Sequence, residues 1–402
     1  MMKPHSPLIK NSLWLLMARI GTQGAMVLFT ILLARRLGSA GFGQYAFIAA
    51  VIFVGNMLTT FGTDMILIRE IAANNNLSQL PAALLIQLGF SIILILVVWI
   101  SAPFLPHQRA ESILALRVYS FAIIPLAFFT VFTTALRGKQ QMDAYTWLNL
   151  TGSFLQLAIV WFFIKQNSSI VTLAFVLLFN QLIVSLIGAI ICAKQIQGFW
   201  RDWHFSGKDV SILLKVSAPL AMLTVIAMLY QKLSVTMVST MSGAVMTGLF
   251  SVSQRTVEGA KTGHAAIFTA LYPAMAQGKN RSFHLPWMLL LIGAVFGAMI
   301  LSMLARPIVQ ILFGVEYEAS IPALQILAWI LVPYAVNTFL TLRFVASKNE
   351  KPVLQASLAS LAVLVVLNIY WIPHAGLVGA GWSALIAETI QSVLLIAHWR
   401  LT

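Results

Sequence analysis

Residues 13–34 read LWLLMARIGTQGAMVLFTILLA, and this stretch decides the class of fold. Arg19 is its only charged residue, and the run is long enough to cross the hydrocarbon core of a bilayer, which takes about 20 predominantly apolar residues in a helix. A cleavable signal peptide is not expected here, because the run is too long for a signal core, contains an arginine and lacks a small-residue cleavage motif. We therefore predict that residues 13–34 form the first membrane-spanning helix.

The rest of the chain repeats this pattern. Of its 402 residues, 60% are hydrophobic and 9% are charged, whereas a typical soluble domain has about 25% charged residues. About twelve segments are long and apolar enough to span a membrane. They cover residues 13–34, 43–66, 82–103, 113–136, 144–164, 169–193, 210–233, 243–275, 286–307, 320–345, 352–373 and 376–399. The sequence thus predicts an all-α polytopic membrane protein.

The longest connection between these segments lies at the middle of the chain. It covers residues 194–209 and reads KQIQGFWRDWHFSGKD. Transporters are often built from two halves that arose as a repeat. We therefore predict two bundles of six helices, in residues 1–200 and 201–402.

A weak internal similarity supports this repeat. LGSAGFGQYAFI, which starts at Leu37, resembles MSGAVMTGLFSV, which starts at Met241, and each follows the first span of its half. Glycine adopts backbone conformations that other residues avoid. Gly38, Gly41 and Gly43 are therefore expected to allow a tight turn and close helix packing between the first two spans.

The net charge of +14 is spread thinly between the apolar runs. A nucleic-acid-binding protein concentrates its cations in a basic patch, whereas scattered cations at span ends set membrane orientation. With the N-terminus inside, the inner segments contain Lys3, Lys10, Arg69, Arg137, Lys139, Lys194, Arg201, Lys208, Lys279, Arg281, Arg343, Lys348, Lys351 and Arg400, and the outer segments contain Arg35, Arg36, Arg109, Lys165 and Arg306. This bias predicts two cytoplasmic termini and excludes nucleic acid as a partner.

No pattern of catalytic or metal-binding residues is found. Cys192 is the single cysteine and lies in an apolar run, where a small core residue is expected. Glu316 and Glu318 are two residues apart, a spacing that does not bring side chains together on a helix. We expect no metal site, no cofactor and no enzymatic activity.

The eighth segment carries three charged residues with a spacing of three: Arg255, Glu258 and Lys261. Residues three apart are neighbours on one side of a helix. Glu258 can pair with either cation, so the trio carries a net single positive charge. Charged side chains within spans are costly and usually face an interior cavity. The alternative for Arg255 is a purely structural ion pair with Glu258.

Two further spans contribute cations. Arg19 lies in the first span, with Gln23 one turn later on the same face, and Lys232 lies in the seventh. Arginine matches phosphate oxygens with a bidentate fork, and lysine adds a point charge. These residues are candidates for binding an anionic substrate. The alternative for Arg19 is a structural ion pair with Asp64.

Ion-driven transport needs a group that changes charge or binds a cation. The carboxylates within the predicted spans are Asp64, Glu258 and Glu388. Glu388 has no cation nearby in the sequence, and it can either carry a proton or be neutral and hydrogen-bonded to Ser383 or Gln391. Coupling to H⁺, to Na⁺ or to no ion is compatible with this pattern.

Several segments resemble one family of membrane transporters. They are NSLWLLMARIG at Asn11, LLARRLGSAGFGQYAF at Leu32, FGTDMILIREIA at Phe61, SAPLAMLTVI at Ser217, GLFSVSQRTVEG at Gly248, ALYPAMA at Ala270 and LFGVEYEASIPALQILAW at Leu312. In this order they resemble the polysaccharide-flippase (Wzx-type) branch of the multidrug/oligosaccharidyl-lipid/polysaccharide (MOP) exporter superfamily.

The resemblance implies two six-helix bundles around a central cavity, with the first, second, seventh and eighth spans lining it. It implies a flippase that moves a polyprenyl-(pyro)phosphate-linked oligosaccharide across the bacterial inner membrane by alternating access, for O-antigen, capsule or exopolysaccharide. Arg19, Gln23, Lys232, Arg255 and Lys261 would then bind the phosphate and glycan. By the same analogy, the partners are membrane lipids, a polysaccharide polymerase and a chain-length regulator.

Other assignments stay open. Arg69 and Glu70 at a span end serve either orientation or gating. A lipid II flippase would also have a cationic cavity, although such proteins usually have two further helices. A cation-coupled multidrug exporter handles mostly cationic compounds, which a cationic cavity disfavours. A membrane glycosyltransferase or polymerase is the most distant alternative, because no long acidic outer loop is found.

Overall fold

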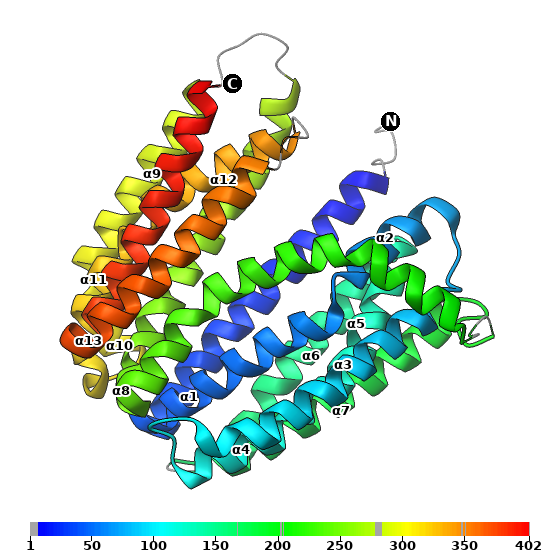
Figure 1. The fold of residues 1–402 in the computed structure, drawn as a ribbon, viewed down its shortest axis with the longest axis horizontal. Helices are drawn as coiled ribbons and strands as arrows, with labels where there is room; N and C mark the ends of the chain where they lie inside the picture. The colour runs from blue at the N-terminus through cyan, green and yellow to red at the C-terminus, as the bar shows by residue number, and fades with distance from the viewer. Residues whose placement is uncertain are drawn as a thin grey trace, which may run out of the picture. The chain divides into compact units, whose positions relative to one another are not determined.

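The computed structural model describes residues 7–401 apart from 167, 202, 204, 278–283, 347, 348 and 350, and this part of the chain is helical, with no strand (Figure 1). The elements are α1 (Pro7–Thr60), α2 (Thr63–Asn74), α3 (Leu80–Ser101), η1 (Ala102–Phe104), α4 (Ala110–Ser120), α5 (Ile123–Gly138), α6 (Met142–Phe163), α7 (Ile170–Gln195), α8 (Gly207–Gln277), α9 (His284–Met303), α10 (Ala305–Leu312), η2 (Val315–Ser320), α11 (Ile321–Ala328), α12 (Leu331–Ala346) and α13 (Lys351–Leu401). Four cations of the orientation argument, Lys3, Lys279, Arg281 and Lys348, lie outside the described residues. The predicted all-α fold is confirmed.

Helices α1, α8 and α13 are each too long for a single membrane crossing. The 71 residues of α8 would make about 107 Å of straight helix, whereas the hydrocarbon core is about 30 Å thick. Each of these helices is interrupted by one glycine with positive φ: Gly38 at 66°, Gly243 at 79° and Gly376 at 54°. Glycine adopts such angles without steric cost. Each long helix therefore contains two successive spans, and the predicted turn at Gly38 is confirmed.

Two other spans are bent. Among the described residues, seven helices are long and apolar enough to cross a membrane by themselves. Two further spans are each made of two helices that meet at a bend: Met288–Met303 with Ala305–Leu312, at 62°, and Val315–Ala328 with Leu331–Phe344, at 40°. Pro333 accounts for the second bend, because it has no N–H for the Trp329 carbonyl; that carbonyl accepts from the Val332 N–H instead, at 3.2 Å. With two spans in each long helix, the described spans reach the predicted twelve.

The contacts divide the chain into two compact units. The first contains Met1–Leu32 and Ile48–Met228, and the second contains Leu33–Phe47 and Leu229–Thr402. The two halves of α1 form the first hairpin, and its tip, around Gly38, belongs to the second unit. The first part of α8, up to Met228, belongs to the first unit. These units are defined by contacts between residues and do not test whether the chain arose as a repeat. The two predicted halves, 1–200 and 201–402, therefore stay a prediction.

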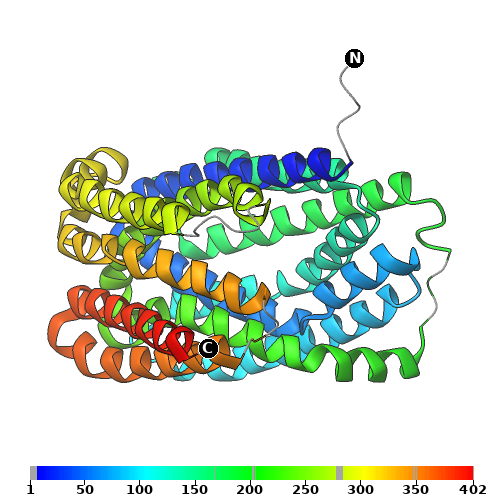
Figure 2. The same cartoon turned by 90° about the horizontal axis from the view of Figure 1, so that it is seen from above.

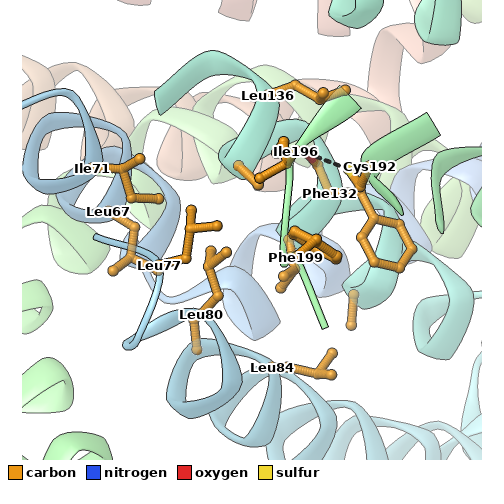
Figure 3. Packing of buried hydrophobic residues seen from close by; sticks show 14 of the residues in the cluster. Leu67, Ile71, Leu77, Leu80, Leu84, Phe132, Leu136, Cys192, Ile196 and Phe199 are labelled. Carbon is orange, nitrogen blue, oxygen red and sulfur yellow. Dashed lines mark hydrogen bonds between the residues drawn. The ribbon is translucent and has the colours of Figure 1, made fainter. Parts of the chain in front are cut away.

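In the first unit, α2, α3, α5 and α7 share an apolar core (Figure 3). Leu67 and Ile71 of α2 pack here with Leu80 of α3 and Phe132 of α5, and all four are at most 2% exposed. The Cys192 thiol on α7 donates a weak hydrogen bond to the Phe132 carbonyl at 3.6 Å. The prediction that Cys192 is a buried core residue is confirmed.

In the second unit, α9, α11, α12 and α13 pack side by side (Figures 1 and 2). Leu290 of α9, Phe339 and Leu340 of α12, and Ala356 and Leu395 of α13 form one buried apolar cluster. Because α13 turns back at Gly376, its two halves contribute to the same cluster from opposite ends of the helix.

The tip of the first hairpin is held by the segment between α10 and α11. The Ser39 N–H, which follows the turn at Gly38, donates to Glu316 Oε1 at 2.6 Å. The Arg35 guanidinium donates through Nε to the Leu312 carbonyl at 2.8 Å. A carboxylate at the start of a helix accepts from an N–H that has no helical partner. Glu316 therefore caps the second half of α1.

Tyr317 adds a buried contact to this tip. It is 1% exposed, and its hydroxyl donates to the Ala34 carbonyl at 2.9 Å. We expect Tyr317→Phe to lower the free energy of unfolding by about 1–2 kcal/mol, because one buried hydrogen bond is lost. Thermal unfolding in detergent measures this. Tyr370→Phe is the control, since Tyr370 is 63% exposed; equal effects of the two variants would contradict the assignment.

Two glycines allow the first hairpin to cross the hairpin of α8 at close range. A Cβ at Gly43 would overlap the Ala244 carbonyl, and a Cβ at Gly248 would overlap the Ser39 carbonyl. Gly43 thus packs on Ala244, which follows the turn at Gly243, and Gly248 packs on Ser39, which follows the turn at Gly38. The close packing predicted for Gly43 is confirmed, and its partner is backbone rather than a side chain.

The same geometry corrects the register of the internal similarity. Aligned from Leu37 and Met241, the two segments pair Gly38 with Ser242. In the structure, Gly38 corresponds to Gly243, since both have positive φ and extended ψ, at 179° and −177°. The predicted register was therefore wrong by one residue, and the corrected register also pairs the two crossing glycines.

Candidate functional site

Lys232, Arg255 and Glu258 meet in the second unit. Lys232 Nζ lies 3.2 Å from Glu258 Oε1, and Arg255 Nη1 lies 3.1 Å from Glu258 Oε2. Lys232 precedes the turn at Gly243 and Glu258 follows it, so they are about 16 and 22 Å along the helix from that turn at 1.5 Å per residue. The reversal of α8 therefore brings together residues that are distant in sequence.

One pairing expected among Arg255, Glu258 and Lys261, on the second half of α8, differs in the structure. Glu258 was expected to pair with Arg255 or Lys261. Its second partner is Lys232, and Lys261 instead places its Nζ 4.7 Å from the ring centroid of Tyr334 on α12. An ammonium over an aromatic face is attracted by the ring quadrupole. Among the described residues, Lys261 therefore contacts an aromatic ring and is not one of the ion-pair partners of Glu258.

The charges of this cluster do not balance. Lys232, Arg255 and Lys261 carry three positive charges, and Glu258 carries one negative charge. The Lys232 side chain is 10% exposed, whereas those of Arg255 and Glu258 are 28% and 33% exposed. A cluster with two excess positive charges and a reachable guanidinium can attract and contact an anion.

Gln254 links the cluster to the first half of α8. Its Nε2 donates to the Gln231 carbonyl at 3.0 Å and to Glu258 Oε1 at 3.3 Å. Glu258 Oε1 therefore accepts from both Lys232 and Gln254. The carboxylate is held at both oxygens, by donors from both halves of the hairpin.

Arg19 and Gln23 lie on α1 in the first unit. They are four residues apart, and both are exposed. The ion pairs between described residues are Lys232–Glu258 and Arg255–Glu258, so the alternative pairing of Arg19 with Asp64 is not among them. The participation of Arg19 and Gln23 in anion binding stays a prediction.

Glu388 on α13 is the centre of a second polar cluster. It is 6% exposed. The Tyr230 hydroxyl donates to its Oε2 at 2.8 Å, and Asn337 Nδ2 donates to its Oε1 at 3.1 Å. Ser392 in turn donates to Asn337 Oδ1 at 2.9 Å. Neutral donors from α8 and α12 thus hold a buried carboxyl group.

The hydrogen-bond partners predicted for Glu388 were wrong. The Ser383 hydroxyl donates to the Gly379 carbonyl of its own helix at 2.9 Å, and Gln391 Nε2 donates to the Ser357 hydroxyl at 3.2 Å. Ser383 and Gln391 thus donate their hydrogen bonds to other residues of α13 and not to Glu388. The donors to Glu388 come from other helices, which the sequence around it does not reveal.

The remaining predicted residues lie on α2. Asp64 is half-buried in the first turn of α2, where a negative charge interacts favourably with the helix dipole. Glu70 accepts from Gln79 Nε2 at 3.0 Å, and Arg69 is exposed. Local structure accounts for Asp64 and Glu70, and a gating role of Arg69 and Glu70 stays a prediction.

Comparison with known proteins adds a family and a fold. The family model described as "Polysaccharide biosynthesis protein" matches residues 8–279, more than half of the chain and the part that contains Lys232, Arg255, Glu258 and Lys261. No curated protein of similar sequence was found.

Solved structures give the fold. The chain is similar to the lipid II flippase MurJ in an inward closed conformation, with a TM-score of 0.77, 16% identity and coverage of 98% of this chain and 87% of that chain. It is also similar to an inward-facing MATE-family multidrug resistance transporter of the MOP superfamily, with a TM-score of 0.71, 15% identity and coverage of 94% of each chain. A MOP superfamily transporter from Pyrococcus furiosus gives 0.59, 16% identity and coverage of 98% and 95%. The chain thus has the helical fold of MOP transporters.

Proposed function

Since the chain belongs to the polysaccharide biosynthesis protein family and has the fold of MOP superfamily transporters, we propose that it is a flippase for a polyprenyl-(pyro)phosphate-linked oligosaccharide. The observation that carries this proposal is the cluster of Lys232, Arg255 and Lys261 around the single carboxylate of Glu258. The repeat unit would cross the bacterial inner membrane by alternating access and feed O-antigen, capsule or exopolysaccharide synthesis.

The substrate's chemistry explains the choice of residues. A sugar headgroup cannot cross hydrocarbon unaided, because its hydroxyls would lose their hydrogen bonds to water. The phosphate next to the lipid is the group that every such substrate shares. Arg255 can bind its oxygens through a planar fork, and Lys232 and Lys261 add point charges. Each charged contact contributes about 1.5–3 kcal/mol.

Glu388 is the group that we propose couples transport to an ion gradient. Its described partners, Tyr230 and Asn337, are neutral, so uptake of a proton or of Na⁺ would change the charge of the cluster. Glu258 is less suited to this role, because two cations already neutralise it. Asp64 is less suited because it is only half-buried, in the first turn of α2.

A lipid II flippase is the second candidate. The similarity to MurJ favours it, and the same cations would bind the pyrophosphate of lipid II. The family model favours the polysaccharide substrate. A multidrug exporter of cationic compounds is disfavoured, because two excess positive charges would repel its substrates.

The proposed place in the cell follows from the orientation argument. Both termini would be cytoplasmic, so substrate would load from the side where its sugars are assembled. Membrane lipids surround the spans, and a polysaccharide polymerase and a chain-length regulator would act on the flipped product.

Deletion and complementation in the native host test the proposal. We expect the deletion strain to lose surface glycan and to accumulate its lipid-linked precursor on the cytoplasmic side. Arg255→Ala, Lys261→Ala and Arg19→Ala should restore at most about a tenth of the glycan, as expected for one lost charged contact. Immunoblotting of membranes checks that each variant is present at the wild-type level.

Lys215→Ala is the matched control, since Lys215 is exposed on α8 and precedes Lys232 by 17 residues of the sequence, in the first unit. It should complement fully. Accumulation of lipid II with lysis would identify a lipid II flippase instead. Normal surface glycan together with new sensitivity to cationic drugs would refute the flippase and favour the exporter.

A further inference from the structure

The Glu258 carboxylate contacts two of the cations that a phosphate would use. Lys232 Nζ and Arg255 Nη1 each contact one of its oxygens, at 3.2 and 3.1 Å. Carboxylate and phosphate groups present pairs of anionic oxygens to the same cationic donors. An anion that uses the same donor atoms, Lys232 Nζ and Arg255 Nη1, therefore competes with Glu258.

Arg255 is only partly engaged by this carboxylate. The described ion pair uses Nη1 alone, although a guanidinium has five N–H donors in a planar fork. Its side chain is 28% exposed, whereas that of Lys232 is 10% exposed. An incoming phosphate can thus contact Arg255 more readily than Lys232, and at either cation it meets the competing carboxylate of Glu258.

We propose that Glu258 is a built-in competitor of the substrate phosphate. With no substrate bound, it holds Lys232 and Arg255; it releases them when the phosphate enters; and it takes them back when the phosphate leaves. The inference rests on the proposed function, because it concerns the same cations. It adds that Glu258 sets how tightly the phosphate is held.

The competitor has a physical purpose. Three cations around one dry phosphate would bind it so tightly that release would be slow, and a transporter must release what it binds. A carboxylate that stays on the same helix lowers the affinity by like-charge repulsion and by competing for the same donors. It also pairs with Lys232, whose side chain is only 10% exposed, and a nearly buried charge is favoured by a counter-ion.

Binding of farnesyl diphosphate to the purified full-length protein in detergent tests the inference. We expect Glu258→Gln to lower the Kd about tenfold or more, because a competing charge is removed. The same variant should restore less surface glycan in the complementation assay than wild type, because release becomes slow. Isothermal titration measures the Kd, and inorganic pyrophosphate as a second probe separates recognition of a lipid diphosphate from recognition of the free anion.

Glu318→Gln is the matched control. It removes the same charge in the same unit, but Glu318 accepts from Gln310 at 2.5 Å and lies outside the cluster. Its Kd should equal that of wild type. If Glu258→Gln leaves the Kd unchanged or raises it while Arg255→Ala raises it, Glu258 is a positioning residue and the inference is wrong, although the proposed function stands. If neither probe binds to wild type or variants, both fail.

A second variant avoids the risk that Glu258→Gln misfolds. In Glu258→Cys the charge can be restored after folding by an anionic methanethiosulfonate, and the native Cys192 is fully buried. The unmodified variant should bind tightly, and anionic modification should weaken binding again. A neutral methanethiosulfonate of similar size controls for bulk. Equal weakening by both reagents would overturn the competitor role.

Discussion

Replacement of Gly248 by alanine is expected to remove most of the folded protein from the membrane. The added Cβ would overlap the Ser39 carbonyl, which belongs to backbone and cannot rotate away as a side chain can. The two hairpins would have to separate, at a cost of about 3 kcal/mol or more. Gly43→Ala should have a similar effect, because its Cβ would overlap the Ala244 carbonyl. Fluorescence-detected size-exclusion chromatography and thermal unfolding measure the loss.

Gly24→Ala is the control for this pair. Gly24 also lies in α1, but nothing lies within 4 Å of its added Cβ, and alanine is the better helix former. It should be neutral or slightly stabilising. The double variant Gly43→Ala with Gly248→Ala should be less destabilised than the sum of the single variants, because one separation of the hairpins relieves both overlaps. Wild-type stability of either single variant would refute the crossing.

Replacement of Glu388 by alanine should be the other severe change. It removes the carboxylate oxygen that the Tyr230 hydroxyl contacts at 2.8 Å, and it leaves Asn337 Nδ2 with only one of its two acceptors, the main-chain carbonyl of residue 388 at 3.1 Å. Each buried polar group that loses its partner costs about 1–3 kcal/mol. We expect a loss of about 3 kcal/mol or more in the free energy of unfolding, measured by thermal unfolding in detergent, and no complementation of surface glycan.

Glu388→Gln separates stability from coupling. It keeps the shape and an acceptor for Tyr230, so the protein should stay folded, yet it cannot take up a proton or a cation by changing charge. If Glu388 is the coupling group, this folded variant does not transport. Thr389→Ala is the control, since Thr389 is exposed and bonds within its own helix. Full transport by Glu388→Gln would exclude the coupling role.

Much of the fold follows from the length of the apolar runs, because every membrane-spanning helix needs about 20 predominantly apolar residues, whichever helices it packs against. The turns are less legible. Gly38 was identified as a turn, but Gly243 was paired with the wrong residue, since letters alone do not report φ. The division of packing at Leu33–Phe47 is also invisible in the sequence, because it depends on contacts between residues hundreds of positions apart.

The site was predictable where its geometry is local. The spacing of Arg255 and Glu258 predicts their contact, since residues three apart are neighbours on a helix. The contact of Lys232 with Glu258 requires the reversal at Gly243, which the spacing does not encode. Tyr230 and Asn337 were missed as partners of Glu388; the available signal was an amide within a predicted span, which needs a partner there.

The cap on the first hairpin has a consequence for biosynthesis. Ser39 and Glu316, which meet at its tip, are 277 residues apart in the chain. At about 5–20 residues per second, Glu316 leaves the ribosome roughly 14 to 55 seconds after Ser39. During that interval the first hairpin is made and its tip has no cap. Capping of the tip is therefore a late event of assembly. A nascent chain that stops before Glu316 contains the first hairpin but lacks the carboxylate that caps it.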